Sequence, residues 1–218
     1  MERSRDRCDA ARRCGLSRCG RLGEKAATGP ARDPVRSPIH LPAAVRKAQP
    51  WQNGGGRTTT IMQVPSDASL DTLDWRISIA DIDSPGPFSL FPGMTRHLMV
   101  LKGGVQLIGE NADATLGIAE GAFRFSGDRR IYATPLVKGT RVLNVIVRRG
   151  RFDGSLRRTT FGSEQRGDNI AVYVADKAAV VTIAGWDYHL SGEDGLMLTG
   201  PGEVLVSSGL IAVDISCR

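Results

Sequence analysis

The chain has 218 residues and a formal net charge of +6, and its composition is ordinary for a globular protein apart from 26 glycines. This length is enough for one large all-β domain or two small ones. No apolar run approaches the ~18 residues of a membrane-spanning helix, so the sequence predicts no membrane partner.

The basic charge is concentrated at the N-terminus. Residues 1–40 hold ten Lys or Arg and five Asp or Glu, so they account for +5 of the net +6. We expect residues 1–37 to form a disordered basic extension, with a targeting segment or a polyanion-binding arm as alternatives. A nucleic-acid partner would therefore rest on this extension alone.

The cysteines predict neither a zinc site nor a disulfide framework. Cys8, Cys14 and Cys19 lack the spacing of a structural zinc site, and Cys217 is the penultimate residue. The N-terminal segment also lacks the apolar core of a secretory signal. Together these features predict a reducing compartment, namely the cytoplasm.

The central stretch of the chain, Trp75 to Gly103, predicts two strands joined by an aromatic loop. Trp75, Ile77 and Ile79 alternate with polar or small residues, as expected of a strand with two different faces. The loop that follows is rich in Pro and Gly and carries Phe88 and Phe91. Together these segments predict a scaffold that could hold a ligand.

Other short apolar segments, separated by turn residues, indicate an all-β chain. In chain order we expect strands over 57–64, 75–80, 96–101, 105–109, two short strands within 115–125, then 141–148, 170–174, 179–183, 186–190, 196–199, 203–206 and 210–215. The polar residues 149–169 predict a linker. We therefore divide the chain into an N-terminal barrel (38–150), a linker (151–164) and a C-terminal barrel (165–218).

Before the first of these strands lies Gly54-Gly55-Gly56. Three consecutive glycines are costly to order, so they indicate positive φ angles or close backbone approach. Two interpretations stay open: a loose turn, or a row of backbone N–H groups that meets an anion.

Several polar residues within the strands are candidates for a carboxylate-binding pocket. Arginine offers a bidentate fork to a carboxylate, and Ser or Asn offers a neutral donor. Periodicity places Arg76 and Ser78 on one face, and Asn144 and Arg148 on another. Each could equally lie on a solvated face, and Phe88 and Phe91 could either wall the pocket or cap a core.

The three histidines, His40, His97 and His189, do not show metal-ligand spacing. We therefore expect neither a metal nor another cofactor. His97 lies in a strand with Met99 and Leu101 on its face, which favours a packed histidine; a catalytic base has no evident partner.

Several motifs in order resemble the HutD/Ves family of bacterial proteins. They are PWQNGGG at 50–56 with Thr58 and Ile61, WRISIA at 75–80, GPFS at 86–89, FPG at 91–93 with Arg96, FSGD at 125–128 and LNVIVRR at 143–149. The resemblance runs from Pro50 towards the C-terminus. Two departures stand out: Thr60 occupies a position where the family usually has Glu, and Leu143 occurs where an acidic residue often precedes the Asn.

The resemblance implies a double cupin, meaning two small RmlC-like jelly-roll barrels in one chain. It also implies a protein of histidine utilisation, or of stress response in the Ves branch. Members are thought to bind a small acidic metabolite, such as urocanate or formylglutamate, without established catalysis. The metal-ligand pattern of enzymatic cupins is missing, and a homodimer through sheet edges is compatible with the family.

Residues and resemblance together predict a metal-free, carboxylate-binding regulatory protein. Arginines would neutralise the carboxylate, neutral groups would orient it, and aromatic rings would cover a flat body; these ligand-binding residues are Arg76, Arg96, Arg148, Asn53, Ser78, Asn144, Trp51 and Phe88. One alternative is a metal-independent isomerase or hydrolase with His97 or Asp128 as base. The other is a regulator that acts through the basic extension. If the family's Glu contacts ligand, Thr60 predicts a different ligand or protonation preference.

Overall fold

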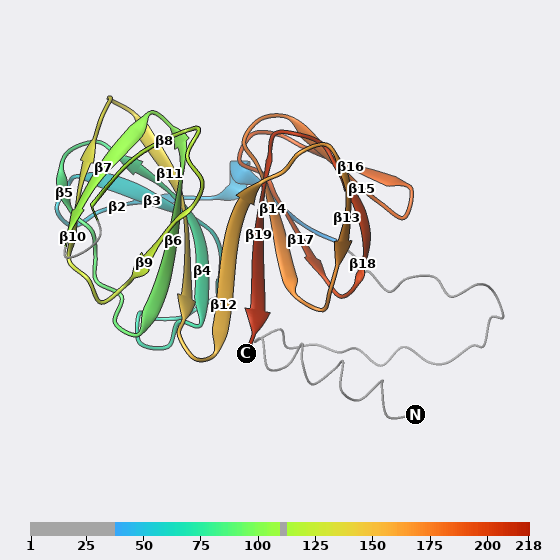
Figure 1. Cartoon of the computed structure of the whole chain (residues 1–218), viewed down its shortest axis with the longest axis horizontal. Helices are drawn as coiled ribbons and strands as arrows, with labels where there is room; N and C mark the ends of the chain where they lie inside the picture. The colour runs from blue at the N-terminus through green and yellow to red at the C-terminus, as the bar shows by residue number, and fades with distance from the viewer. Residues whose placement is uncertain (1–37, 110–112) are drawn as a thin grey trace.

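The computed structural model describes residues 38–109 and 113–218. Apart from one 3-10 helix, η1 (Ala43–Val45), its regular elements are strands, so the all-β prediction is confirmed. The predicted disordered extension at residues 1–37 lies outside the described residues. Two β barrels lie side by side (Figure 1).

The N-terminal barrel consists of two antiparallel sheets. The larger sheet has the order β2 (Ala48–Pro50), β3 (Gly56–Val64), β4 (Trp75–Ile82), β11 (Thr140–Arg148), β6 (Met94–Lys102) and β9 (Phe123–Ser126). The smaller sheet has the order β5 (Gly86–Pro87), β10 (Ile131–Pro135), β7 (Gly104–Gly109) and β8 (Ala114–Gly117).

The C-terminal barrel has the same construction. Its larger sheet has the order β1 (Ile39–Leu41), β17 (Gly195–Thr199), β14 (Ile170–Ala175), β19 (Leu210–Cys217) and β12 (Phe152–Arg158). Its smaller sheet has the order β13 (Gly162–Arg166), β18 (Gly202–Val206), β15 (Ala179–Ile183) and β16 (Trp186–Leu190).

The two barrels are topological repeats of one eight-stranded unit. The order β4-β11-β6-β9 in one barrel matches β12-β19-β14-β17 in the other, and β5-β10-β7-β8 matches β13-β18-β15-β16. Every strand of the second unit therefore follows its counterpart by eight. The expected pair of small barrels is thus present, although the sequence shows no residue-level repeat.

The expected domain boundaries differ from the structure at two places. Residues 151–164 were expected to form a linker, but they contain β12 and the start of β13, which pair with β19 and β18. Only Phe152 and Leu156 of β12 are apolar, and the other five residues are polar, charged or glycine, which explains why the sequence reads as a linker. At the other boundary, β1 pairs with β17, so Ile39–Leu41 belong to the C-terminal barrel.

A large apolar layer joins the two barrels. Trp75, Ile77 and Ile79 of β4 pack in one cluster with Val172 of β14 and Val213 of β19, and all five are almost fully buried. Burial of each large apolar side chain away from water stabilises the folded protein by roughly 1.5–3 kcal/mol. Each barrel also has its own interior cluster. Both faces of the larger N-terminal sheet are therefore covered.

Two observations bear on the predicted cellular location. Cys217 is disulfide-bonded, so the expectation of a chain without disulfides does not hold at this residue. In the part of the chain that the structure describes, no helix has the length and hydropathy of a membrane span. The cytoplasmic location stays a prediction.

Candidate functional site

The N-terminal barrel contains a cavity of about 630 Å³. The inner faces of β3, β4, β11 and β6 form its base, and the segments at 49–53 and 87–91 surround it. Its lining residues are Gln49, Pro50, Trp51, Gln52, Asn53, Thr58, Thr60, Leu70, Arg76, Ser78, Ala80, Pro87, Phe88, Ser89, Phe91, Arg96, Asn144 and Ile146.

Arg96 is the most deeply placed charge in this cavity, with only 6% of its surface exposed. Its Nη1 donates to the Ser89 carbonyl oxygen at 3.1 Å, and its Nη2 donates to Asn144 Oδ1 at 3.5 Å. Its Nε is buried without a hydrogen-bond partner among the described residues. Burial, and then the charge of Arg76, lower the pKa of Arg96 to about 9. The site therefore holds a cation at a desolvation cost.

Arg76 adds a second positive charge, and no acidic side chain of the described residues forms an ion pair with it. Its Nε is also buried without a partner among the described residues, and burial lowers its pKa. None of the described residues that line the cavity is Asp or Glu. Buried charges are normally paired, so this arrangement favours an anion that comes from outside the protein.

Aromatic rings hold the two guanidinium groups in place. The guanidinium carbon of Arg96 lies 4.9 Å, 5.3 Å and 4.8 Å from the ring centroids of Phe88, Phe91 and Phe125. That of Arg76 lies 5.1 Å from the Phe91 ring. Such contacts stabilise a cation without neutralising it. The rings therefore orient both arginines and leave their charge available to a ligand.

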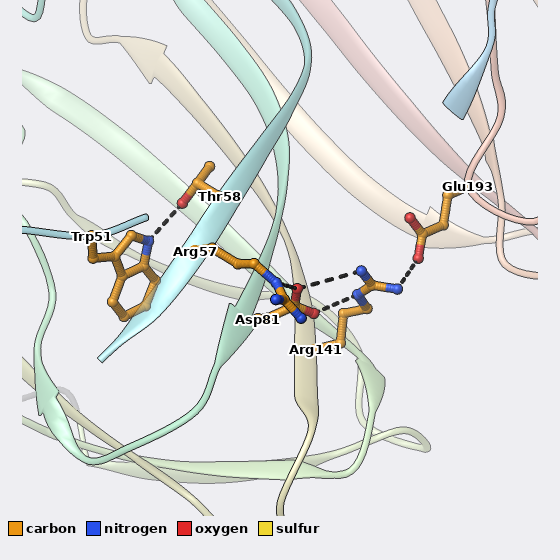
Figure 2. Close-up of polar contacts among 6 residues, drawn as sticks. All are labelled: Trp51, Arg57, Thr58, Asp81, Arg141 and Glu193. Atoms are coloured by element: carbon orange, nitrogen blue, oxygen red, sulfur yellow. Dashed lines mark hydrogen bonds and ion pairs between the residues drawn. The ribbon is translucent and has the colours of Figure 1, made fainter. Parts of the chain in front are cut away.

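Trp51 is one of the aromatic residues that line the cavity. Its Nε1 donates to Thr58 Oγ1 on β3 at 2.8 Å (Figure 2), so this polar group is already engaged. Trp51 also meets Phe88 edge to face, with ring centroids 6.3 Å apart. An apolar or flat part of a ligand could pack against these two aromatic rings.

The three glycines shape the loop that positions Trp51. The N–H of Gly54 donates to the Trp51 carbonyl and that of Gly55 donates to Asn53 Oδ1, so both are used within the loop. A Cβ atom at Gly56 would lie 2.2 Å from the Asp81 carbonyl oxygen and 3.2 Å from the Trp51 ring. Close backbone approach is therefore the reason for Gly56, and the interpretation as an anion-binding row is not supported at Gly54 and Gly55.

A chain of ion pairs fixes β3 and β4 against the second barrel (Figure 2). Asp81 accepts hydrogen bonds from Arg57 Nε at 2.6 Å and from Arg141 Nε at 2.7 Å, and Arg141 Nη1 also contacts Glu193 of the C-terminal barrel. Burial opposes ionisation of Asp81, but the two arginines outweigh it and lower its pKa. The strands beneath the cavity are thereby held in register.

Seven of the eight predicted ligand-binding residues line this one cavity; they are Trp51, Asn53, Arg76, Ser78, Phe88, Arg96 and Asn144. Arg148 does not line it. Its Nε donates to the Leu73 carbonyl at 2.9 Å and its Nη2 to the Asp71 carbonyl at 2.7 Å. Arg148 shares a face with Asn144, but it lies four residues further along β11, roughly 13 Å away. Ligand contact by the other seven stays a prediction.

The sequence analysis did not identify several residues that line the cavity. Thr58 and Thr60 belong to it, and their alternation along β3 is a sequence signal that could have identified them. Phe91 also belongs to it. Ser89 contributes its carbonyl oxygen to Arg96, a role that no side-chain pattern reveals.

The two candidate bases of the enzyme alternative lie elsewhere. His97 faces the second barrel, and burial followed by the charge of Arg124 lowers its pKa to about 4. Asp128 is held by the Gly93 N–H, Ser126 and Arg149, which lower its pKa. Among the described residues, no group of three His, Cys, Asp or Glu is placed to hold a metal ion.

Comparison with known proteins agrees with this architecture. The HutD family model matches residues 43–210. A 21.2-kDa protein from the hutC 3' region of Pseudomonas putida is 33% identical over 165 residues, which is 72% of this chain and 84% of that protein. Protein Ves of Citrobacter koseri is 41% identical over 121 residues, covering 52% of this chain and 62% of Ves.

Solved structures show the same fold. A conserved protein from Pseudomonas aeruginosa PAO1 superposes with a TM-score of 0.75 at 28% identity, covering 83% of this chain and all of that one. HutD from Pseudomonas fluorescens SBW25, in a formate condition, gives a TM-score of 0.74 at 24% identity, covering 84% of this chain and all of that one. These likenesses confirm the double-cupin fold.

Proposed function

Because this chain belongs to the HutD family, we propose that it is a cytoplasmic regulatory protein of histidine utilisation that binds a small carboxylate. The binding site is the cavity of the N-terminal barrel. The Pseudomonas putida relative, named for its place beside hutC, supports the association with histidine-utilisation genes. Urocanate and formylglutamate are the first ligands to test.

One observation carries the proposal: buried Arg96 and half-buried Arg76 line a cavity in which no described lining residue is acidic. A carboxylate would accept charge-assisted hydrogen bonds from Arg76 and Arg96, which are about twice as strong as neutral ones. Ser78 and Asn144 would orient the rest of the ligand. Trp51 and Phe88 would cover its flat part.

The described lining gives no support to the enzyme alternative. Proton transfer at neutral pH needs a group that titrates near neutral pH and reaches the substrate. His97 and Asp128, the bases considered, both lie outside the lining. Binding without turnover is therefore the function that this geometry favours.

A thermal-shift screen of the full chain tests the proposal. The panel holds urocanate, formylglutamate, glutamate, histidine and formate, each with and without EDTA. A ligand that binds only the folded protein raises Tm by mass action. We expect a rise that survives EDTA, that is lost in Arg76→Ala and Arg96→Ala, and that is retained in the control Arg130→Ala, an exposed turn residue. A flat screen, or an equal rise in all variants, overturns the proposal.

A further inference from the structure

The base of the cavity carries two parallel rows of side chains with different chemistry. Strand pairing places Arg76 beside Ile146 and Ile146 beside Arg96, which gives a charged row across β4, β11 and β6. The neighbouring row crosses β3, β4 and β11, because Thr60 pairs with Ser78 and Ser78 with Asn144. Positions two residues apart on one strand are about 6.6 Å apart, so the rows are this far apart at the backbone, although the side chain of Arg96 reaches Asn144 Oδ1 at 3.5 Å.

The second row is polar but uncharged, and it has free hydrogen-bonding capacity. The hydroxyl groups of Thr60 and Ser78 make no hydrogen bond to another described residue, and Asn144 uses only its Oδ1, towards Arg96. Ser78 and Asn144 are 2% and 6% exposed, so few water molecules can reach them. A polar ligand group loses its hydrogen bonds to water when it enters the cavity. New hydrogen bonds to this row therefore offset that desolvation cost.

A cationic ligand group would be disfavoured at the same place. It would lie within about 7 Å of two arginines, and the described lining holds no carboxylate to neutralise it. Desolvation and like charge both act against a cation there. An amide, a hydroxyl group or a neutral ring nitrogen carries no charge, so it has neither the desolvation cost of a cation nor the repulsion from the two arginines.

We propose that this site selects carboxylates whose second polar group carries no positive charge. Thr60 is then the residue that determines specificity, since it holds the outer end of the neutral row and is half-buried on β3. This inference rests on the proposed carboxylate site. It adds a rule about the other end of the ligand, which excludes amino acids that carry a free ammonium group at that end.

Two probes of nearly the same size and shape test the rule. 5-Amino-5-oxopentanoate ends in an uncharged amide, whereas 5-aminopentanoate ends in an ammonium group. Isothermal titration calorimetry of the full chain should show at least tenfold tighter binding of the amide. Thr60→Glu supplies the missing carboxylate, and it should shift the preference at least tenfold towards the ammonium probe. Thr60→Gln, similar in size to Glu but uncharged, should keep the preference for the amide.

The outcomes separate the two proposals. Equal binding of both probes, or an unchanged preference in Thr60→Glu, overturns the neutral-row rule while the carboxylate site stands. Binding of neither probe to the unaltered chain counts against the carboxylate site and against the rule together. Circular dichroism melting of each variant shows whether it is folded, and Thr60→Gln and Thr60→Glu alter the same partly exposed position.

Discussion

Each barrel places two arginines near its polar interior, but among these four only Arg157 of the C-terminal barrel is paired with a carboxylate of the described residues. Arg157 donates through both Nη atoms to Glu164 at 2.7 Å, and Tyr173 donates to the same carboxylate at 2.9 Å. Burial lowers the pKa of Arg166, although Tyr173, Asp214 and Glu164 oppose this, and its Nη1 has no hydrogen-bond partner among the described residues. In the N-terminal barrel, Arg76 and Arg96 meet aromatic rings and neutral groups instead.

The difference identifies which barrel is built to receive a ligand. In the C-terminal cluster Glu164 neutralises Arg157, and the hydrogen bonds between them join β12 to β13. The N-terminal pair keeps its positive charge beside an open cavity. Since both barrels share one topology, the fold does not decide this. Whether a barrel can receive an anionic ligand depends instead on the presence or absence of a carboxylate such as Glu164 beside its arginines.

The largest expected effect comes from removing the deepest cation of the N-terminal barrel. Arg96→Leu should weaken carboxylate binding about 1,000-fold, or about 4 kcal/mol. The unfolding free energy of the ligand-free protein should not fall, because the substitution also removes a buried charge without a counter-ion. Calorimetric titration and urea unfolding measure the two quantities. Undiminished binding would show that Arg96 does not contact the ligand.

We expect low pH to destabilise the protein by protonating His97 between the two barrels, and not through a group in the cavity. The pKa of His97 is about 4 in the folded protein, against about 6.5 unfolded. As pH falls below 6.5, the unfolded chain takes up this proton first, so stability is lost between pH 6.5 and 4, by up to about 3 kcal/mol. Urea unfolding across this range should show the loss.

Substitution of the histidine is the control for this acid effect. His97→Leu should flatten the pH dependence of unfolding between pH 6.5 and 4 while leaving carboxylate binding at pH 7 unchanged. Arg124 on β9 and Asp153 on β12 face His97 and oppose each other in their effects on it. A variant with the same pH dependence as the original chain would assign the acid effect to another group.

A smaller effect is expected when the C-terminal cluster loses its carboxylate. Glu164→Gln removes the charge that holds Arg157 and the Tyr173 hydroxyl, and we expect it to lower the unfolding free energy by about 2 kcal/mol. Carboxylate binding in the N-terminal barrel should stay the same. Thermal unfolding and titration of this variant make the comparison with Arg96→Leu direct. Equal stability with and without Glu164 would contradict the neutralisation argument.

The local pattern of the sequence determined most strands and the pairing of residues on faces. Alternation alone placed Arg76 with Ser78, and the structure keeps them on one side of β4. It could not reveal β12, because that strand is held by long-range pairing with β19 and carries only two apolar side chains, Phe152 and Leu156. Nor could it show that Arg148 ends at the Leu73 and Asp71 carbonyls.

Only the tertiary structure decided which face of β4 is the inside of the barrel. By pattern, Trp75, Ile77 and Ile79 would form the core, while Arg76 and Ser78 could either line a pocket or face water. In the molecule the apolar side packs on the second barrel, and the polar side lines the cavity. Period-two alternation shows that the two faces of the strand differ. Which part of the protein covers each face depends on a second barrel, which is formed by residues about a hundred positions away.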